Sequence, residues 1–129
     1  MTDLHTLTAA ELLAQFASRQ LAPIDYYDQL LAHIDRWEPQ INALYAFDPQ
    51  QVRQQAQAST ERWNKGQPNG ALDGVPVTLK ELIATEGVPI PLGSAATRLT
   101  PALRDAPPAA RMREAGAIIL SKTTNPDFG

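Results

Sequence analysis

The residue in this sequence with the clearest chemical potential is Lys80, which closes a segment of alternating apolar side chains over residues 75–80. An amine at the end of a strand can act as a general base or a nucleophile once it has lost its proton. A solvated strand-end charge, or an ion pair with Glu81 or Glu86, explains the same residue without any chemistry. Adjacent strand residues point to opposite faces, however, so Glu81 is badly placed to neutralise Lys80. Because α/β proteins bind ligands at the ends of parallel strands, a catalytic role for Lys80 stays open beside the simpler explanation.

Other polar residues are weaker candidates. His33 lies on a predicted helix and is interpreted as a packing or surface residue rather than a ligand. Ser94 follows a glycine in a turn-rich stretch without a nearby base, which favours a turn serine over a nucleophile. The chain has no cysteine, and its two histidines, His5 and His33, are far apart in the sequence. We therefore predict no metal site, no thiol chemistry and no cofactor.

The composition predicts one soluble globular domain or less. The chain has 129 residues, of which 43% are hydrophobic and 19% charged, and its formal net charge is −3. This apolar share excludes a disordered tail. Basic residues are scattered among acidic ones, so we expect no nucleic-acid partner. The longest apolar run, residues 115–120, is far shorter than a membrane span, and the start of the chain has no signal-peptide core, which predicts a cytoplasmic protein without membrane contact.

Helical signals dominate residues 1–66, which we interpret as a helical lead-in. Thr8 and Glu11 form a capping-box pattern before an apolar run, which predicts a first helix. Asp48 has the position of a second cap, and the apolar stripe that follows it predicts another helix, ending at Gly66.

A longer amphipathic helix is predicted between these two. Pro23 suits its first position, and apolar residues recur at helical spacing as far as Trp37. Pro39 is expected to stop this helix, since proline lacks the amide hydrogen that a helix interior needs. The pattern of residues 41–47 is ambiguous between strand and coil.

Residues 67–129 show a different pattern and are interpreted as the start of an α/β core. Alternation over residues 75–80 predicts a strand, and Pro76, which lacks an amide hydrogen, predicts either an edge position for this strand or one unpaired position within it. Residues 107–115 predict a short helix, and the apolar run 117–120 predicts a buried strand. Strand, helix and strand in this order predict a parallel pair in an α/β sheet.

A loop and a helix cap complete this half of the chain. The many prolines and glycines of residues 87–101 predict an ordered irregular loop. Asp105 precedes the two prolines that open the short helix and is a candidate for its cap.

Several separated blocks of the second half match one enzyme family in order and spacing. These blocks are residues 72–81, 87–89, 93–94, 105–107 and 111–129. The sequence resembles the amidase signature family over nearly its whole length, and its helical first half is similar too. The resemblance implies an incomplete mixed α/β fold. It also implies a catalytic group of a nucleophilic serine, a second serine bound through a cis peptide, and a lysine that matches Lys80.

The resemblance also implies that part of the catalytic group lies elsewhere. The family's two serines come from a Gly/Ser-rich stretch that follows the segment matching residues 122–129, and this sequence contains no such stretch. We therefore expect an amino-terminal fragment of an amidase that cleaves carboxylic amide (C–N) bonds through a serine acyl-enzyme, with Lys80 as the base. The fragment alone is expected to be inactive. Its expected partners are a small-molecule amide and the rest of the amidase chain or a complementary subunit; its substrate-binding residues are not indicated.

Alternatives to this interpretation remain open. Glu81 stands where the family more often has aspartate, which favours a divergent bacterial-type amidase over the subunit of the tRNA-dependent amidotransferase. A noncatalytic interaction or assembly fragment that retains part of the amidase fold is also compatible with the sequence. A lysine Schiff-base enzyme is a third interpretation of Lys80.

Overall fold

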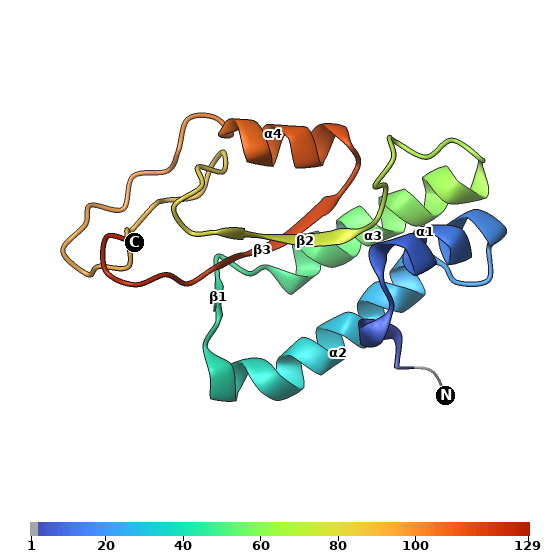
Figure 1. Cartoon of the computed structure of the whole chain (residues 1–129), viewed down its shortest axis with the longest axis horizontal. Helices are drawn as coiled ribbons and strands as arrows, with labels where there is room; N and C mark the ends of the chain where they lie inside the picture. The colour runs from blue at the N-terminus through green and yellow to red at the C-terminus, as the bar shows by residue number, and fades with distance from the viewer. Residues whose placement is uncertain (1–2) are drawn as a thin grey trace.

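The computed structural model describes residues 3–129 and confirms the predicted α/β class (Figure 1). In chain order its elements are η1 (Leu4–Thr6), α1 (Ala9–Ser18), α2 (Pro23–Ile41), β1 (Leu44–Tyr45), α3 (Pro49–Asn64), β2 (Pro76–Lys80), α4 (Pro107–Glu114) and β3 (Ile118–Thr123). The strands form one mixed sheet in the order β1-β3-β2.

The predicted starts of α1 and α3 are confirmed. The Thr8 hydroxyl accepts a hydrogen bond from the Glu11 amide (3.3 Å), and the Glu11 carboxylate accepts one from the Thr8 amide (2.8 Å). The Asp48 carboxylate caps α3 by accepting from the Gln51 amide (3.1 Å). In each case a short polar side chain satisfies an amide that has no partner inside the helix.

The predicted end of α2 at Pro39 is wrong, because the helix continues to Ile41. Pro39 lies in the last turn, so its missing amide hydrogen removes a single helical hydrogen bond. The Asn42 amide then closes the turn on the Glu38 carbonyl (2.8 Å), with Asn42 in the left-handed conformation (φ 52°). The Glu38 carboxylate also accepts from the Leu44 amide (2.8 Å), which leads the chain directly into β1.

Asp105 does not cap α4, contrary to the prediction. The residue at the cap position is Ala106, which offers no side-chain hydrogen bond. The Asp105 carboxylate instead accepts from the Glu86 amide (2.8 Å) and from Nε of Arg113 (2.7 Å). A hydrogen bond to a charged guanidinium is stronger than one to a helix amide. The carboxylate therefore joins the start of the 87–101 loop to α4.

The predicted parallel pair is confirmed. β2 pairs with β3 in parallel from Pro76 opposite Ile118 to Lys80 opposite Thr123, with an irregularity between Val77 and Thr78. Within residues 3–129, β2 has β3 as its single neighbour, so Pro76 begins an edge strand as predicted. On its other side β3 pairs with β1, a strand of two residues that runs antiparallel to it. The stretch 41–47, which was ambiguous between strand and coil, therefore contains a short strand.

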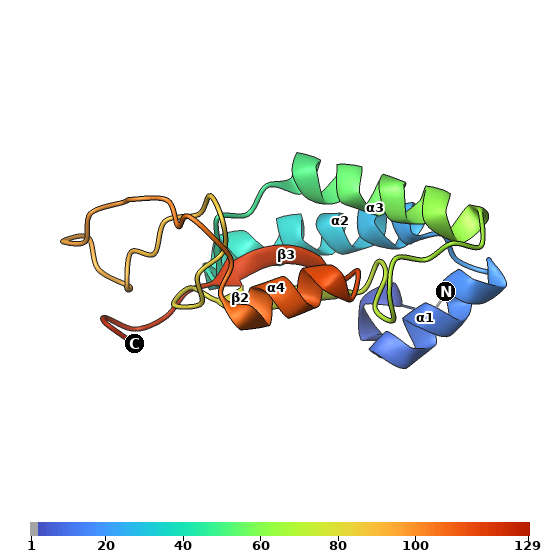
Figure 2. The ribbon, with the colours of Figure 1, turned by 90° about the horizontal axis from the view of Figure 1, so that it is seen from above.

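One hydrophobic core joins the two halves of the chain. Ile118 and Leu120 of β3 belong to the same buried cluster as Phe16 of α1, Tyr27 of α2 and Val52 of α3. Figure 1 shows α4 on one side of the strands and α2 on the other. Figure 2 shows the loop between β2 and α4 extending beyond the helices, at the end of the sheet where β2 and β3 finish.

We expect Gly116→Ala to destabilise the fold by more than about 2 kcal/mol. Gly116 follows α4 with φ +86°, and a Cβ there would collide with the Asn69 carbonyl oxygen and lie 2.9 Å from Cα of Asp73. The control is Gly66→Ala, since Gly66 has a similar φ of +67° but no atom within 4 Å of a built Cβ, and about 1 kcal/mol is expected there. Urea unfolding of both variants measures the difference, and equal losses would contradict this account.

Candidate active site

Lys80 lies at the carboxyl end of β2, with its side chain exposed. The predicted alternation is confirmed at the end of this strand, where Leu79 is buried and Thr78 and Lys80 are exposed, whereas Pro76 and Val77 are both half-buried. None of the ion pairs within residues 3–129 includes Lys80. The structure thus leaves this amine facing solvent at the carboxyl end of a parallel strand, where α/β proteins bind ligands.

Glu81 does not pair with Lys80. Its side chain is buried, and both carboxylate oxygens accept from the Gly93 amide (3.2 and 3.3 Å). The nearby residue Tyr45 has a raised pKa because its hydroxyl is partly desolvated and because the charge of Glu81 opposes its ionisation. The expectation that Glu81 is badly placed to neutralise Lys80 therefore agrees with the geometry.

Lys122 is a second lysine at this end of the sheet, opposite Leu79 in the β2–β3 register. It is buried, and its ammonium donates to the carbonyl oxygens of Glu81 (3.0 Å) and Ile83 (2.5 Å). Burial lowers the pKa of Lys122, and the negative charge of Glu81 opposes this effect. Sequence reasoning did not single out this residue. The available signal was a lysine two residues after a continuous apolar run, with one serine between them.

The serine hydroxyls of this chain already take part in hydrogen bonds of the fold. Ser59 is buried and donates to the Asp73 carboxylate (2.7 Å), and Ser121 is buried and donates to the Tyr45 carbonyl (2.9 Å). The Ser94 hydroxyl accepts from the Ala96 amide (3.3 Å) within a turn, in agreement with its interpretation as a turn serine. Ser18 is exposed at the end of α1, and its hydroxyl donates a hydrogen bond to the Gln15 carbonyl (3.2 Å).

The two histidines are adjacent in space despite their separation in sequence. The rings of His5 and His33 stack with their centroids 4.0 Å apart, and Trp37 lies beside them at 6.4 Å from His33. His33 is thus a packing residue, as interpreted. No group of three or more side chains able to hold a metal ion occurs within residues 3–129.

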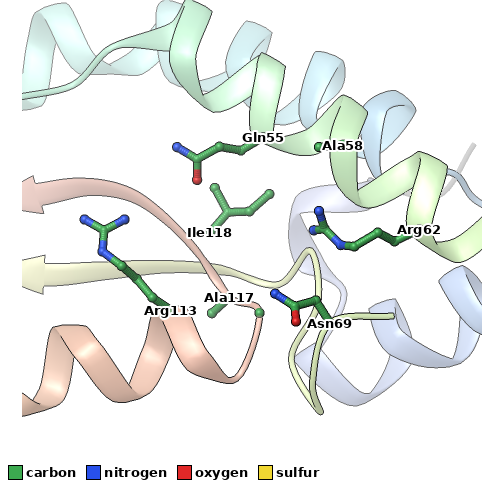
Figure 3. Close-up of a pocket in the computed structure, with 8 residues that line it drawn as sticks. Gln55, Ala58, Arg62, Asn69, Arg113, Ala117 and Ile118 are labelled. Carbon is green, nitrogen blue, oxygen red and sulfur yellow. The ribbon is translucent and has the colours of Figure 1, made fainter. Parts of the chain in front are cut away.

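A small cavity of about 230 Å³ lies away from Lys80, between α3 and α4. Figure 3 shows Arg62 and Arg113 entering it from opposite sides of Ile118. Arg62 pairs with the buried Asp73 through two hydrogen bonds of 2.7 Å, and Arg113 pairs with Asp105. Both guanidinium groups are therefore committed to ion pairs of the fold.

The structure is an α/β sheet with an exposed lysine at the end of a parallel strand, and comparison with known proteins shows which family it represents. The family model described as Amidase matches residues 25–129. The chain belongs to this family, the amidase signature enzymes, as the resemblance predicted.

The individual relatives agree with this assignment. The acylamidase of Rhodococcus erythropolis is 35% identical over 98% of this chain, and a glutamyl-tRNA(Gln) amidotransferase subunit of Streptomyces coelicolor is 34% identical over 99%. A solved structure described as an amidase is 30% identical with a TM-score of 0.84 over 95% of the chain, and a bacterial aryl acylamidase is 26% identical with a TM-score of 0.86 over 99%.

The chain spans about a quarter of the length of these relatives: 27% of the acylamidase, 26% of the amidotransferase subunit, and 28% and 27% of the two solved chains. The two sequence relatives are almost equally similar to it, so the preference for an amidase over an amidotransferase subunit stays a prediction. None of the helices within residues 3–129 has the length and apolar character needed to cross a membrane.

Proposed function

We propose that this chain contributes the base to an amide hydrolase that cleaves C–N bonds through a serine acyl-enzyme. The observation that carries the proposal is Lys80, exposed at the carboxyl end of β2 in a chain of the amidase family. In this proposal the two serines come from sequence beyond residues 1–129. A small-molecule amide is the substrate, and the cytoplasmic location stays a prediction from the sequence.

The proposed reaction assigns one task to Lys80. As a neutral amine it takes a proton, through a bridging serine, from the nucleophilic serine, whose oxygen attacks the amide carbonyl. The C–N bond of the substrate then breaks, and its amine product leaves with the proton that Lys80 had taken. Water hydrolyses the acyl-enzyme and releases the acid. A lysine ordinarily has a pKa of about 10.4, so a lysine base needs burial or cationic neighbours to be neutral near pH 7. An added segment that covers the exposed end of β2 would supply that burial.

The serines of this chain support the requirement for an added segment. The hydroxyls of Ser59 and Ser121 are buried and already donate to acceptors of the fold. Ser94 holds a turn of the 87–101 loop. An isolated chain would therefore hold the proposed base without a nucleophile paired to it.

We expect the purified 129-residue chain to show no turnover of a simple aryl amide above the rate in buffer. A chimera in which this chain replaces the matching region of the Rhodococcus erythropolis acylamidase is expected to be active. Release of the aryl amine, followed by absorbance, measures both. Turnover by the isolated chain would contradict the assignment of the nucleophile to an added segment, and a folded but inactive chimera would contradict the proposed role of this chain.

A second candidate function is that of an amidotransferase subunit, favoured by the 34% identity to the Streptomyces coelicolor protein. The chain matches 26% of that subunit, so the proposed function would need the remainder of the same subunit and, in addition, a complementary subunit as partner. Fusion to the remainder of the Streptomyces coelicolor protein separates the two candidates, because an amidotransferase subunit should support glutamine hydrolysis while an amidase need not. A noncatalytic interaction fragment should support neither reaction in either fusion.

A further inference from the structure

The proposed reaction has no use for the buried amine of Lys122. Its side chain is 2% exposed, and within residues 3–129 its partners are the carbonyl oxygens of Glu81 and Ile83. A buried ammonium is unfavourable unless hydrogen bonds satisfy it. An apolar side chain would fill the same space without this requirement, so the amine needs an explanation other than packing.

Both carbonyls belong to the turn that begins at Lys80. The Ile83 amide donates to the Lys80 carbonyl (2.9 Å), and the Glu81 amide donates to the Thr123 carbonyl of β3 (2.9 Å). The turn is thus held to β3 twice, through the Glu81 amide and through the Lys122 ammonium. Because Lys122 binds two carbonyls of the same turn, it restrains the turn itself as well as its contact with the sheet.

The Glu81 side chain connects this turn to the neighbouring loop. Its carboxylate accepts from the amide of Gly93, which has φ +66°. A Cβ on Gly93 would lie 2.6 Å from the carbonyl oxygens of Asn125 and Pro126, so this position accepts only glycine. The turn after Lys80, the loop at Gly93 and the segment after β3 therefore form one connected unit around the Lys122 ammonium.

We infer that Lys122 is a positioning residue for Lys80: its ammonium fixes the Lys80–Ile83 turn and so the direction in which the Lys80 side chain leaves the sheet. The inference rests on the proposed function, because a catalytic Lys80 is what needs a fixed direction. A base must reach the proton it takes within hydrogen-bond distance, so small errors of direction reduce its efficiency.

Amide hydrogen exchange of the 129-residue chain tests the restraint directly. In Lys122→Met, the Glu81 and Ile83 amides are expected to exchange at least about tenfold faster, while the Tyr27 amide in α2 keeps its rate. The control is Lys65→Met, which removes an exposed amine after α3 and should change neither site. Equal protection in the two variants, or a uniform increase across the molecule, would overturn the inference.

Chemical rescue separates the ammonium from the packing of the side chain. The chain has no cysteine, so Lys122→Cys carries a single thiol. Aminoethylation of that thiol in denaturant, followed by refolding, builds a side chain of nearly the shape and charge of lysine. The rescued chain should regain slow exchange at Ile83, whereas the same thiol capped with a neutral ethyl group should not. Equal exchange in the two capped chains would contradict a role for the charge.

A measurement on the unaltered chain covers the case in which the Lys122 variants do not fold. With the chain labelled uniformly by 15N and 13C, the ammonium protons of Lys122 should exchange slowly and show hydrogen-bond couplings to the carbonyl carbons of Glu81 and Ile83, while those of Lys65 exchange rapidly. Rapid exchange at Lys122 would overturn the inference.

Measurements of catalytic activity test whether Lys122 acts through Lys80. In an active chimera, Lys122→Met is expected to lower kcat about tenfold with little change in KM, since substrate contacts are retained. An unchanged kcat would contradict positioning. The exchange measurements need no turnover, so their failure is distinguishable from failure of the proposed function, which an inactive but folded chimera would show.

Discussion

Lys80→Ala in the active chimera with the Rhodococcus erythropolis acylamidase is expected to lower kcat by about 10²–10⁴-fold, the usual contribution of a positioned base. The loss should appear equally in kcat/KM, because the amine acts on the proton of the nucleophile and not on bound substrate. Lys80 makes no ion pair within residues 3–129 and its side chain is exposed, so removal of its amine leaves the fold intact. Initial rates of aryl amine release measure the effect.

Two variants make this result specific. Lys80→Arg keeps the positive charge but should not restore activity, because a guanidinium does not lose its proton at accessible pH. Lys65→Ala removes another exposed lysine and should leave kcat within about twofold, the scale of an ordinary surface change. Full activity in Lys80→Ala would contradict the assignment of the base to this chain. Full activity in Lys80→Arg would indicate that Lys80 acts through its charge and not by proton transfer.

Local sequence signals predict the fold correctly where the hydrogen bonds of a single residue decide how a helix or strand begins. Thr8 and Asp48 cap their helices as predicted, because each needs only an amide within its own first turn. Pro76 marks an edge strand for the same kind of reason, since its missing amide hydrogen is a property of that residue alone.

The errors arise at two helix ends where contacts outside the helix's own apolar pattern decide the structure. Asp105 was predicted as a cap from its position before α4, but the Arg113 guanidinium and the Glu86 amide bind its carboxylate. Pro39 was expected to stop α2, but the Asn42 amide and the Glu38 side chain hold the last turn together. The contacts of Asp105 depend on how the loop packs against α4, and the end of α2 depends on the left-handed conformation of Asn42, so neither follows from the position of a proline.

The candidate site shows the same division. The alternation that ends at Lys80 was enough to place that residue at an exposed strand end. Lys122 was missed because polar residues after an apolar run signal the end of a buried strand, and the predicted strand stopped at residue 120. The strand continues to Thr123, because the Glu81 and Ile83 carbonyls satisfy the Lys122 ammonium inside the protein. Lys122 can be buried because those carbonyls accept its hydrogen bonds, and they belong to another part of the chain that the pattern of a single strand does not reveal.

Asp73→Asn is expected to destabilise the fold by about 2–3 kcal/mol, less than for a pair with both partners buried, because the Arg62 side chain keeps 34% of its surface exposed. The Asp73 side chain is fully buried, and its carboxylate binds the Arg62 guanidinium twice (2.7 Å each), the Ser59 hydroxyl (2.7 Å) and the Asn69 amide (2.5 Å). An amide cannot accept all four bonds and leaves Arg62 without its counter-charge. Urea unfolding at pH 7 measures the loss.

A matched control and a graded variant test the cause. Asp28→Asn makes the same change in the exposed pair with Arg53, and less than about 1 kcal/mol is expected there. Ser59→Ala removes a single donor to Asp73 and should cost about 1–2 kcal/mol, so it reports on the cluster even if Asp73→Asn does not fold. Similar losses for Asp73→Asn and Asp28→Asn would contradict a special role for burial.

The pH dependence gives an independent check on the charge of Asp73. Burial alone would raise the pKa of this carboxyl, but the hydrogen bonds from Arg62, the Asn69 amide and Ser59, together with the charge of Arg62, outweigh it and hold the pKa below the ordinary 3.8. A carboxyl whose folded-state pKa is lowered stabilises the fold fully above its ordinary pKa and loses that contribution as the pH falls through the folded-state value. The difference in unfolding free energy between the wild type and Asp73→Asn should therefore be constant at neutral pH and shrink below about pH 4. A difference that stays constant into strong acid would mean that the carboxylate charge is not what Arg62 requires.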